Sequence, residues 1–295
     1  MNEKRYWSGL RTAWKAIWDD PSHVSFSEQD HGSWKLIKSE PRTQVILLQP
    51  GTSHKPLICK IYKTPRHLAW RTIGLASRAN REFTALMVAH RRGLPVVRPR
   101  YWIEERELGQ VTYSAITLEF IEGANLEEIM KSKPKSELRK RLAHKAGAFL
   151  RQLHRSGLYW ATACPRNIMM PQGPDSKMLA IDMPYVRWLD RDLYGGEAAL
   201  SDMRNMLRCK NQDWGFDPEE RREFLMGYCK GDTLMAAGLE PLVKPLSIRR
   251  SKLKRIKSRS ADVLLNYPRS PGKGGIYCPS DGSYRVRDSK VISIG

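Results

Sequence analysis

The chain has 295 residues, of which 41% are hydrophobic and 28% charged, so it is long enough to form a two-lobed globular domain. Its 51 Lys and Arg outnumber its 31 Asp and Glu, and the formal net charge of +20 favours a polyanionic partner. The five cysteines are scattered without a C-x-x-C pair, which argues against a zinc site or a disulfide framework and for a reducing compartment. The sequence has neither a secretory signal pattern nor an apolar run of the roughly 18 residues that a transmembrane helix needs.

Residues 1–22 are predicted to form an amphipathic helix, with Trp7, Trp14 and Trp18 at helical spacing among cations. Two interpretations stay open at this point. The helix docks onto the body of the protein, or it lies in a membrane interface with its tryptophans at headgroup depth and its cations facing anionic lipid.

Residues 23–123 are predicted to form a small antiparallel sheet lobe with one helix. Strands are expected in WKLIKS, TQVILLQ and PLICKIYK, and again around RPRYWIEE and VTYSAITLEFIEG, because apolar and β-branched residues are bounded there by turn residues. The helix is expected in RANREFTALMVAHRRG, with Phe83, Leu86, Met87 and His90 on its apolar stripe.

Residues 124–245 are predicted to form a mainly helical lobe that contains a long amphipathic helix at 136–156. Residues 246–295 begin with the basic run RRSKLKRIKSR and continue with many Pro, Gly and Ser, which predicts a basic, mostly irregular tail. The order of sheet, helix, sheet and helices indicates an α+β chain.

Four side chains indicate nucleotide chemistry. Lys60 lies in the third predicted strand, where it would meet nucleotide phosphates, and Glu82 lies on the following helix, where it would pair with that lysine. Asn167 lies in PRNIMM, and Asp182 directly follows a short apolar strand, so both could offer oxygen ligands to Mg²⁺. Taken singly, each has a more common explanation as a solvated surface, turn or cap residue; their order and the lobes around them favour a site.

These residues resemble the lipopolysaccharide kinase (Kdo/WaaP) family, relatives of protein kinases. The segments that carry the resemblance are CKIYK, RANREF, RRGLPVVRP, LHRSGLY, PRNIM and AIDM, within residues 30–230. The resemblance implies a protein-kinase-like fold with ATP in the cleft between the lobes, and adenine bound by main-chain groups at Glu119, Phe120 and Ile121. It also implies phosphate contacts from Lys60, which Glu82 positions, and Mg²⁺ held by Asn167 and Asp182.

The sequence departs from that family at two places. The first predicted hairpin, KSEPRTQ, lacks the glycines of a phosphate-binding turn, and Lys38, Arg42 or backbone amides could substitute in part. Alignment on Asn167 also puts Thr162 at the position of the family's catalytic Asp and Trp160 at that of its His. A threonine hydroxyl is a poor proton acceptor near neutral pH, and the loss of a general base typically costs about 10²- to 10⁴-fold in rate.

Other polar residues near this loop have weaker assignments. Asp202 is expected to brace the loop through its backbone, with a helix N-terminal acid as the alternative, and His154 is expected to pack or brace. Asp190 and Asp192 are the carboxylates that could fold back to replace the base. A role of Thr162 or Cys164 as a covalent nucleophile is disfavoured, since the sequence shows no general base that would activate either side chain.

Three hypotheses for function follow. The first is ATP-dependent phosphotransfer to a lipopolysaccharide core sugar or related anionic glycolipid, with an impaired or atypical base. The second is a nucleotide-binding pseudokinase that acts as a scaffold or regulator in envelope biogenesis. The third is a basic membrane- or polyanion-binding protein on a kinase frame. The expected location is cytoplasmic and peripheral on the inner membrane, through the three N-terminal tryptophans and the basic tail; no nucleic-acid recognition motif is evident, so no specific nucleic acid is expected.

Overall fold

The computed structural model describes residues 33–49, 55–208 and 215–243, together with three short strands between residues 275 and 284. The predicted N-terminal helix with its three tryptophans, and most of the predicted basic tail, lie outside these residues. The described chain divides into two compact units. Of the described residues, the first takes those up to 88, those at 97–120 and the strands beyond 274, and the second takes those at 89–96 and those from 121 to 243. The predicted division into four parts stays a prediction.

The first unit is built on an antiparallel sheet with the strand order β1-β2-β3-β5-β4-β11. Its strands are β1 (Ser33–Glu40), β2 (Thr43–Gln49), β3 (Leu57–Lys63), β4 (Pro99–Glu107), β5 (Gln110–Glu119) and β11 (Gly275–Tyr277). In β2, buried and half-buried residues alternate, as expected for a strand with one face toward the core. The pairing Lys60↔Ile116 places β5 directly beside β3.

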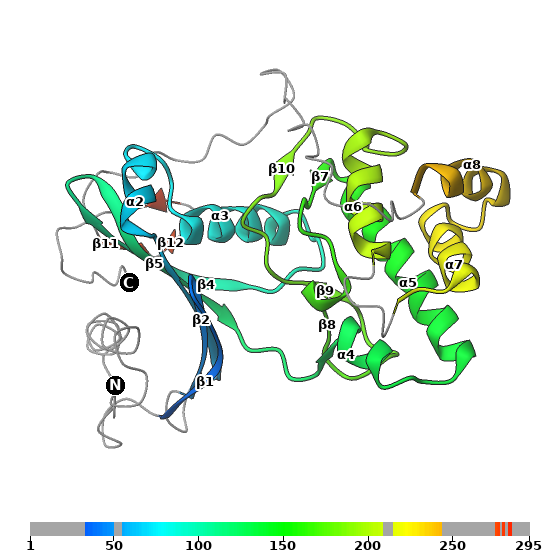
Figure 1. Cartoon of the computed structure of the whole chain (residues 1–295), viewed down its shortest axis with the longest axis horizontal. Coiled ribbons are helices and arrows are strands. Elements are labelled where there is room, and N and C mark those ends of the chain that lie inside the picture. The colour runs from blue at the N-terminus through cyan, green and yellow to red at the C-terminus, as the bar shows by residue number, and fades with distance from the viewer. Residues whose placement is uncertain are drawn as a thin grey trace. The chain divides into compact units, whose positions relative to one another are not determined.

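Helix α3 (Arg78–Arg91) belongs mainly to this unit, and the short α2 (Arg66–Ala69) and η1 (Trp70–Thr72) come before it (Figure 1). Phe83 and Leu86 are fully buried, as predicted. His90, however, is exposed and Met87 is only half-buried, so the predicted stripe was wrong at these two positions. The buried face instead runs through Ala79, Glu82 and Ala89, because small residues and a paired carboxylate allow close packing there.

The second unit is centred on two long helices, α5 (Ser136–Arg155) and α7 (Pro218–Tyr228), which lie side by side in Figure 1. Two glycines allow this approach. A Cβ on Gly147 would lie 1.9 Å from the carbonyl oxygen of Phe224, and one on Gly227 would lie 1.9 Å from that of His144. No side chain fits at these distances, so the helices cross backbone to backbone.

The second unit also contains two further helices of the same length as α7, together with shorter elements. They are β6 (Ala124–Asn125), α4 (Leu126–Lys131), β7 (Leu158–Tyr159), η2 (Pro165–Asn167), β8 (Ile168–Met170), β9 (Leu179–Ala180), β10 (Arg187–Trp188), α6 (Glu197–Leu207) and α8 (Thr233–Val243). Near the C-terminus, β12 (Pro279–Ser280) pairs with β13 (Ser283–Tyr284). The sheet-rich first unit and the mainly helical second unit confirm the predicted α+β class. No helix of the described residues is long and apolar enough to cross a bilayer.

Candidate functional site

In the first unit, Lys60 and Glu82 form a buried ion pair. The Lys60 Nζ lies 2.8 Å from the Glu82 Oε1, and the Tyr62 hydroxyl donates a hydrogen bond to the other oxygen, Oε2. The carboxylate is fully buried and the lysine is 8% exposed. A buried carboxylate needs such partners, because the loss of one partner typically costs about 3–5 kcal/mol. The pair therefore fixes the Lys60 ammonium group against the helix that carries Glu82.

Local structure explains how this pair forms. Lys60 stands in the central strand β3 between Val45 on β2 and Ile116 on β5, and Glu82 lies one turn into α3. The Tyr62 contact was not predicted. The sequence did indicate that Tyr62 lies on the same face of the strand as Lys60, because residues two apart in a strand point to the same side.

The first hairpin turns at Pro41 and Arg42, between β1 and β2. The side chains of Lys38 and Glu40 beside this turn form an exposed ion pair at 2.6 Å. The hairpin is thus closed by strand pairing and a surface ion pair, and the assignment of Lys38 and Arg42 to phosphate contacts remains a prediction.

In the second unit, the loop from Gly157 to Asn167 is held by Asp202 of α6. One oxygen of this carboxylate accepts a hydrogen bond from the backbone N–H of Trp160 and the other from that of Ala161, both at 2.8 Å. Ala161 has φ +63°, a left-handed conformation that is uncommon for a residue with a Cβ. Asp202 thus stabilises a strained turn of backbone, and the predicted loop contact is present.

His154 completes this support. Its Nε2 lies 3.2 Å from the Asp202 Oδ2 and its Nδ1 lies 2.8 Å from the Tyr228 hydroxyl. All three side chains are fully buried. Burial raises the pKa of Asp202 above its ordinary value, while the hydrogen bonds from His154, Trp160 and Ala161 act in the opposite direction. The predicted bracing role of His154 agrees with this contact, and the Tyr228 partner was not predicted because it lies 74 residues away in sequence.

Thr162 and Trp160 both bond to one atom of Asp182. The threonine Oγ1 donates to the main-chain oxygen of Asp182 at 2.9 Å, and the Trp160 indole N–H donates to the same oxygen at 3.2 Å. Thr162, which aligns with a catalytic Asp, therefore uses its hydroxyl proton in a hydrogen bond to the backbone of Asp182, the predicted metal ligand. The fully buried Trp160 indole stands at the position of the family's His and packs edge-on against Phe149.

Asn167 lies next to the same segment. Its amide Nδ2 donates to the main-chain oxygen of Thr162 at 2.9 Å, and its main-chain oxygen accepts from Ile181 N at 2.9 Å. The pairing of Ile168 with Ala180 joins β8 to β9 directly before Asp182. The structure therefore brings Thr162, Asn167 and Asp182 together, and their roles in catalysis and metal binding stay predictions.

This donor set fits Mg²⁺. With its Nδ2 used as a donor, Asn167 presents Oδ1 as the side-chain atom able to accept, and Asp182 supplies a carboxylate, so both are hard oxygen ligands. Mg²⁺ is commonly held by one or two carboxylates together with substrate phosphates rather than by a full protein cage. Among the described residues, no group of three or more His, Cys, Asp or Glu could hold a metal ion alone. Asp182 has φ +63°, a conformation that Asp and Asn tolerate better than most residues.

Of the two carboxylates expected to replace the base, Asp192 is engaged elsewhere. Asp192 forms a two-pronged ion pair with Arg151, with both N–O distances at 2.6 Å, and this contact lowers its pKa. Asp175 pairs with Arg141 at 2.9 Å. Asp190 is exposed. Cys164 is half-buried, and burial raises the pKa of its thiol, which makes it a poor nucleophile.

The predicted adenine-binding segment begins at the end of β5. The N–H of Glu119 donates to the Arg98 carbonyl at 3.0 Å, and that of Phe120 donates to the Pro56 carbonyl at 3.2 Å. These two donors are therefore used within the first unit. The assignment of Glu119, Phe120 and Ile121 to adenine stays a prediction that now depends on their carbonyl groups and on the N–H of Ile121.

Comparisons with known proteins identify a family and a fold. Residues 62–228, more than half of the chain, match the model of the lipopolysaccharide kinase (Kdo/WaaP) family. A solved structure of WaaP in complex with acyl carrier protein is similar, with a TM-score of 0.50 and 15% sequence identity, over 71% of this chain and 89% of that chain. At this identity the similarity shows the fold alone, which is protein-kinase-like. No curated protein matches the chain.

Proposed function

The chain belongs to the lipopolysaccharide kinase (Kdo/WaaP) family, and from this membership we propose that it binds Mg²⁺–ATP and transfers the γ-phosphate slowly to a sugar of the lipopolysaccharide core. Lys60, positioned by Glu82, contacts the nucleotide phosphates. Asn167 and Asp182 hold Mg²⁺, which when bound neutralises phosphate charge. The acceptor is an anionic glycolipid at the cytoplasmic face of the inner membrane.

The observation that carries this proposal is the Lys60–Glu82 ion pair at 2.8 Å. A protein that used this fold only as a frame would have no need to bury a charged pair, because apolar residues of similar volume are often at least as stabilising. The pair is thus best explained by a ligand that needs an ammonium group at a fixed position.

The rate is expected to be low because Thr162 stands where a base is needed. Phosphoryl transfer has a loose transition state, so positioning and charge neutralisation supply most of the catalysis. A site with these two features and no base is expected to retain transfer about 10²- to 10⁴-fold below that of a complete site.

The test is label transfer from γ-labelled ATP to lipopolysaccharide core oligosaccharide by the full chain with Mg²⁺. We expect slow incorporation that Lys60→Met abolishes. Lys63→Met is the matched control, since Lys63 lies on the same strand with its ammonium over the Tyr113 ring. Incorporation that survives Lys60→Met would contradict the proposal.

A second candidate, a nucleotide-binding scaffold without turnover, is favoured by one observation. The Thr162 hydroxyl is engaged with the Asp182 carbonyl at 2.9 Å, which suits a structural rather than a catalytic residue. ATP binding that Lys60→Met weakens, with no label transfer to any core oligosaccharide, would support this candidate over the first.

For localisation, we propose peripheral attachment to the inner membrane through Trp7, Trp14, Trp18 and the basic tail. The support is the sequence alone: tryptophans among cations near one end, and the run RRSKLKRIKSR near the other. Two such signals together are what stable peripheral binding usually requires.

A further inference from the structure

We propose that the first unit carries a preformed docking surface for a bilayer that contains anionic phospholipid. Its apolar members are Trp70, Ile73, Leu75 and Leu108, its cationic members are Arg66, His67 and Arg71, and we call it the Trp70 surface. The inference rests on the proposed function, because it names where the protein meets the membrane that holds its acceptor. It consists of other residues than the N-terminal tryptophans and the basic tail.

The apolar members are far more exposed than their chemistry favours. The exposed fraction is 59% for Trp70, 55% for Ile73, 56% for Leu75 and 90% for Leu108. Single exposed apolar residues are normal on a soluble protein, but a group of large ones at one place marks an interaction site.

Contacts place these residues together. A Cβ built on Gly109, the residue after Leu108, would lie 3.9 Å from the Ile73 Cγ2. The Arg106 guanidinium donates to the carbonyl of Gly109 at 2.8 Å, to that of Thr72 at 3.3 Å and to that of Leu75 at 2.6 Å. The tip of the β4–β5 hairpin is therefore joined to the segment that carries Trp70, Ile73 and Leu75.

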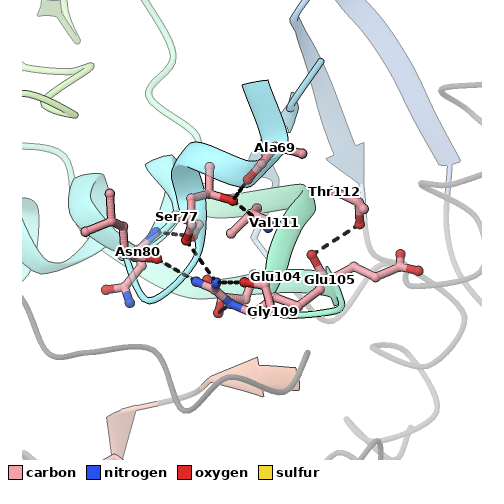
Figure 2. Close-up of polar contacts among 11 residues, drawn as sticks. Ala69, Ser77, Asn80, Glu104, Glu105, Gly109, Val111 and Thr112 are labelled. Atoms are coloured by element: carbon pink, nitrogen blue, oxygen red, sulfur yellow. Dashed lines mark hydrogen bonds and ion pairs between the residues drawn. The ribbon is translucent and has the colours of Figure 1, made fainter. Parts of the chain in front are cut away.

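Polar bonds beneath the surface hold it rigid. Arg106 is anchored by the buried Glu104 at 2.7 Å. The Thr72 hydroxyl donates to the Ala69 carbonyl at 2.6 Å and accepts from Val111 N at 2.7 Å. Figure 2 shows Ala69, Glu104, Gly109 and Val111 converging on this network. Because these hydrogen bonds hold the segment in place, its fold does not depend on burying its apolar side chains, and they can stay exposed.

The chemistry of the surface favours a lipid headgroup region as the occupant. The Trp70 indole N–H already donates to the His67 carbonyl at 3.1 Å, so the ring can enter a less polar region without losing a hydrogen bond. Arg71 lies over that ring at 5.2 Å from its centroid. Tryptophan beside cations is the usual composition at a membrane interface, and each cation near anionic lipid strengthens the attraction to the membrane.

The charge of the surface also fits this occupant. Arg66, His67 and Arg71 are exposed beside the apolar residues, with Glu107 as an exposed acid next to Leu108. The chain as a whole carries a formal charge of +20. An excess of cations around protruding apolar side chains complements an anionic bilayer.

The test is sedimentation of the full chain with vesicles of phosphatidylethanolamine and phosphatidylglycerol, compared with phosphatidylcholine alone. We expect the double variant Trp70→Ser with Leu108→Ser to weaken binding to anionic vesicles about tenfold, because two apolar anchors are lost. Arg71→Glu should also weaken it and reduce its salt dependence. Ile37→Ser is the matched control, since Ile37 is a 51% exposed apolar residue on β1 of the same unit.

Each other outcome overturns the proposal. Unchanged vesicle binding by the double variant would show that the Trp70 surface does not touch lipid. A change in self-association on gel filtration, with vesicle binding intact, would assign the surface to a second copy of the chain. No ATP or acceptor is present in the assay, so its failure leaves the proposed phosphotransfer untouched, and loss of phosphotransfer leaves this result standing.

Discussion

The Thr162 hydroxyl donates a hydrogen bond to the main-chain oxygen of Asp182 at 2.9 Å. This contact joins the residue at the expected base position to the residue at the expected metal position. The Trp160 indole donates to the same oxygen. The residues that align with the family's His and Asp, Trp160 and Thr162, therefore both donate hydrogen bonds to the Asp182 backbone. The loop is therefore built for holding Asp182 in place rather than for abstracting a proton.

Thr162→Val should lower the free energy of unfolding by about 1 kcal/mol, because one partly buried hydrogen bond is lost. Thr162→Ser keeps the donor and should cost less than roughly 0.5 kcal/mol. Denaturant titration measures both. Equal stability of the valine variant and wild type would mean that the hydroxyl bond contributes nothing.

Thr162→Asp should fail to raise phosphotransfer, because an ionised carboxylate cannot donate to the Asp182 carbonyl and would be repelled by it. The same label-transfer assay measures this. A large gain in rate would show instead that the site lacks only its base.

Asp202→Asn should cost about 3 kcal/mol in unfolding free energy, since a fully buried carboxylate loses its charge-assisted bonds and sets an amide N–H₂ against donors. The matched control is Glu197→Gln on the same helix, where the side chain is 75% exposed and the change should stay within about 0.5 kcal/mol. Chemical denaturation at neutral pH measures both. Similar losses for the two variants would contradict the bracing role.

The stability difference between wild type and Asp192→Asn should depend on pH. Arg151 lowers the pKa of Asp192 in the folded state, so the ion pair stabilises the fold above the unfolded-state pKa of about 3.9 and this contribution is lost as pH falls through the lower folded-state pKa. Because the Asp192 side chain is 41% exposed, the expected difference at pH 7 is only about 0.5 kcal/mol. Thermal unfolding between pH 7 and pH 3 measures it, with the exposed Asp190→Asn as control. A difference that grows at low pH would reverse the assignment.

Cys59 should resist alkylation in the folded protein. Burial in β3 raises the pKa of its thiol to about 12, so almost no thiolate is present at pH 8, and the thiolate is the reactive form. Peptide mapping after iodoacetamide treatment should find Cys59 unmodified without denaturant and modified with it. Rapid labelling of the native protein would mean that the strand opens readily.

Much of the fold could be predicted from local pattern. The strands around Lys60 alternate or run apolar between turn residues, and the long helix at 136–156 has a clear apolar stripe, so both were located correctly. Helix α2 was missed because four residues give no period. The edge pairing of β11 with β4 joins residues about 170 positions apart, and no local signal indicates it.

For the site, the sequence indicated the residue types but not their partners. The order Lys60, Glu82, Asn167 and Asp182 identified the family pattern, and the ion pair and the loop contacts follow it. The engagement of Asp192 with Arg151 could not be foreseen, because Asp190 and Asp192 look equivalent in sequence. The Trp70 surface was missed because an apolar run such as HLAWRTIGLA predicts burial, and only the Arg106 network explains its exposure.

The most direct test of the account is calorimetry of ATP binding with and without Mg²⁺, on wild type and Asp182→Asn. Asparagine is chosen because residue 182 has φ +63°, which it tolerates, so the backbone should stay in place. The control is the exposed Asp190→Asn. The account predicts Mg²⁺-dependent binding that Asp182→Asn weakens about tenfold or more and that Asp190→Asn leaves unchanged. Absence of ATP binding, or binding indifferent to both Mg²⁺ and Asp182, would contradict it.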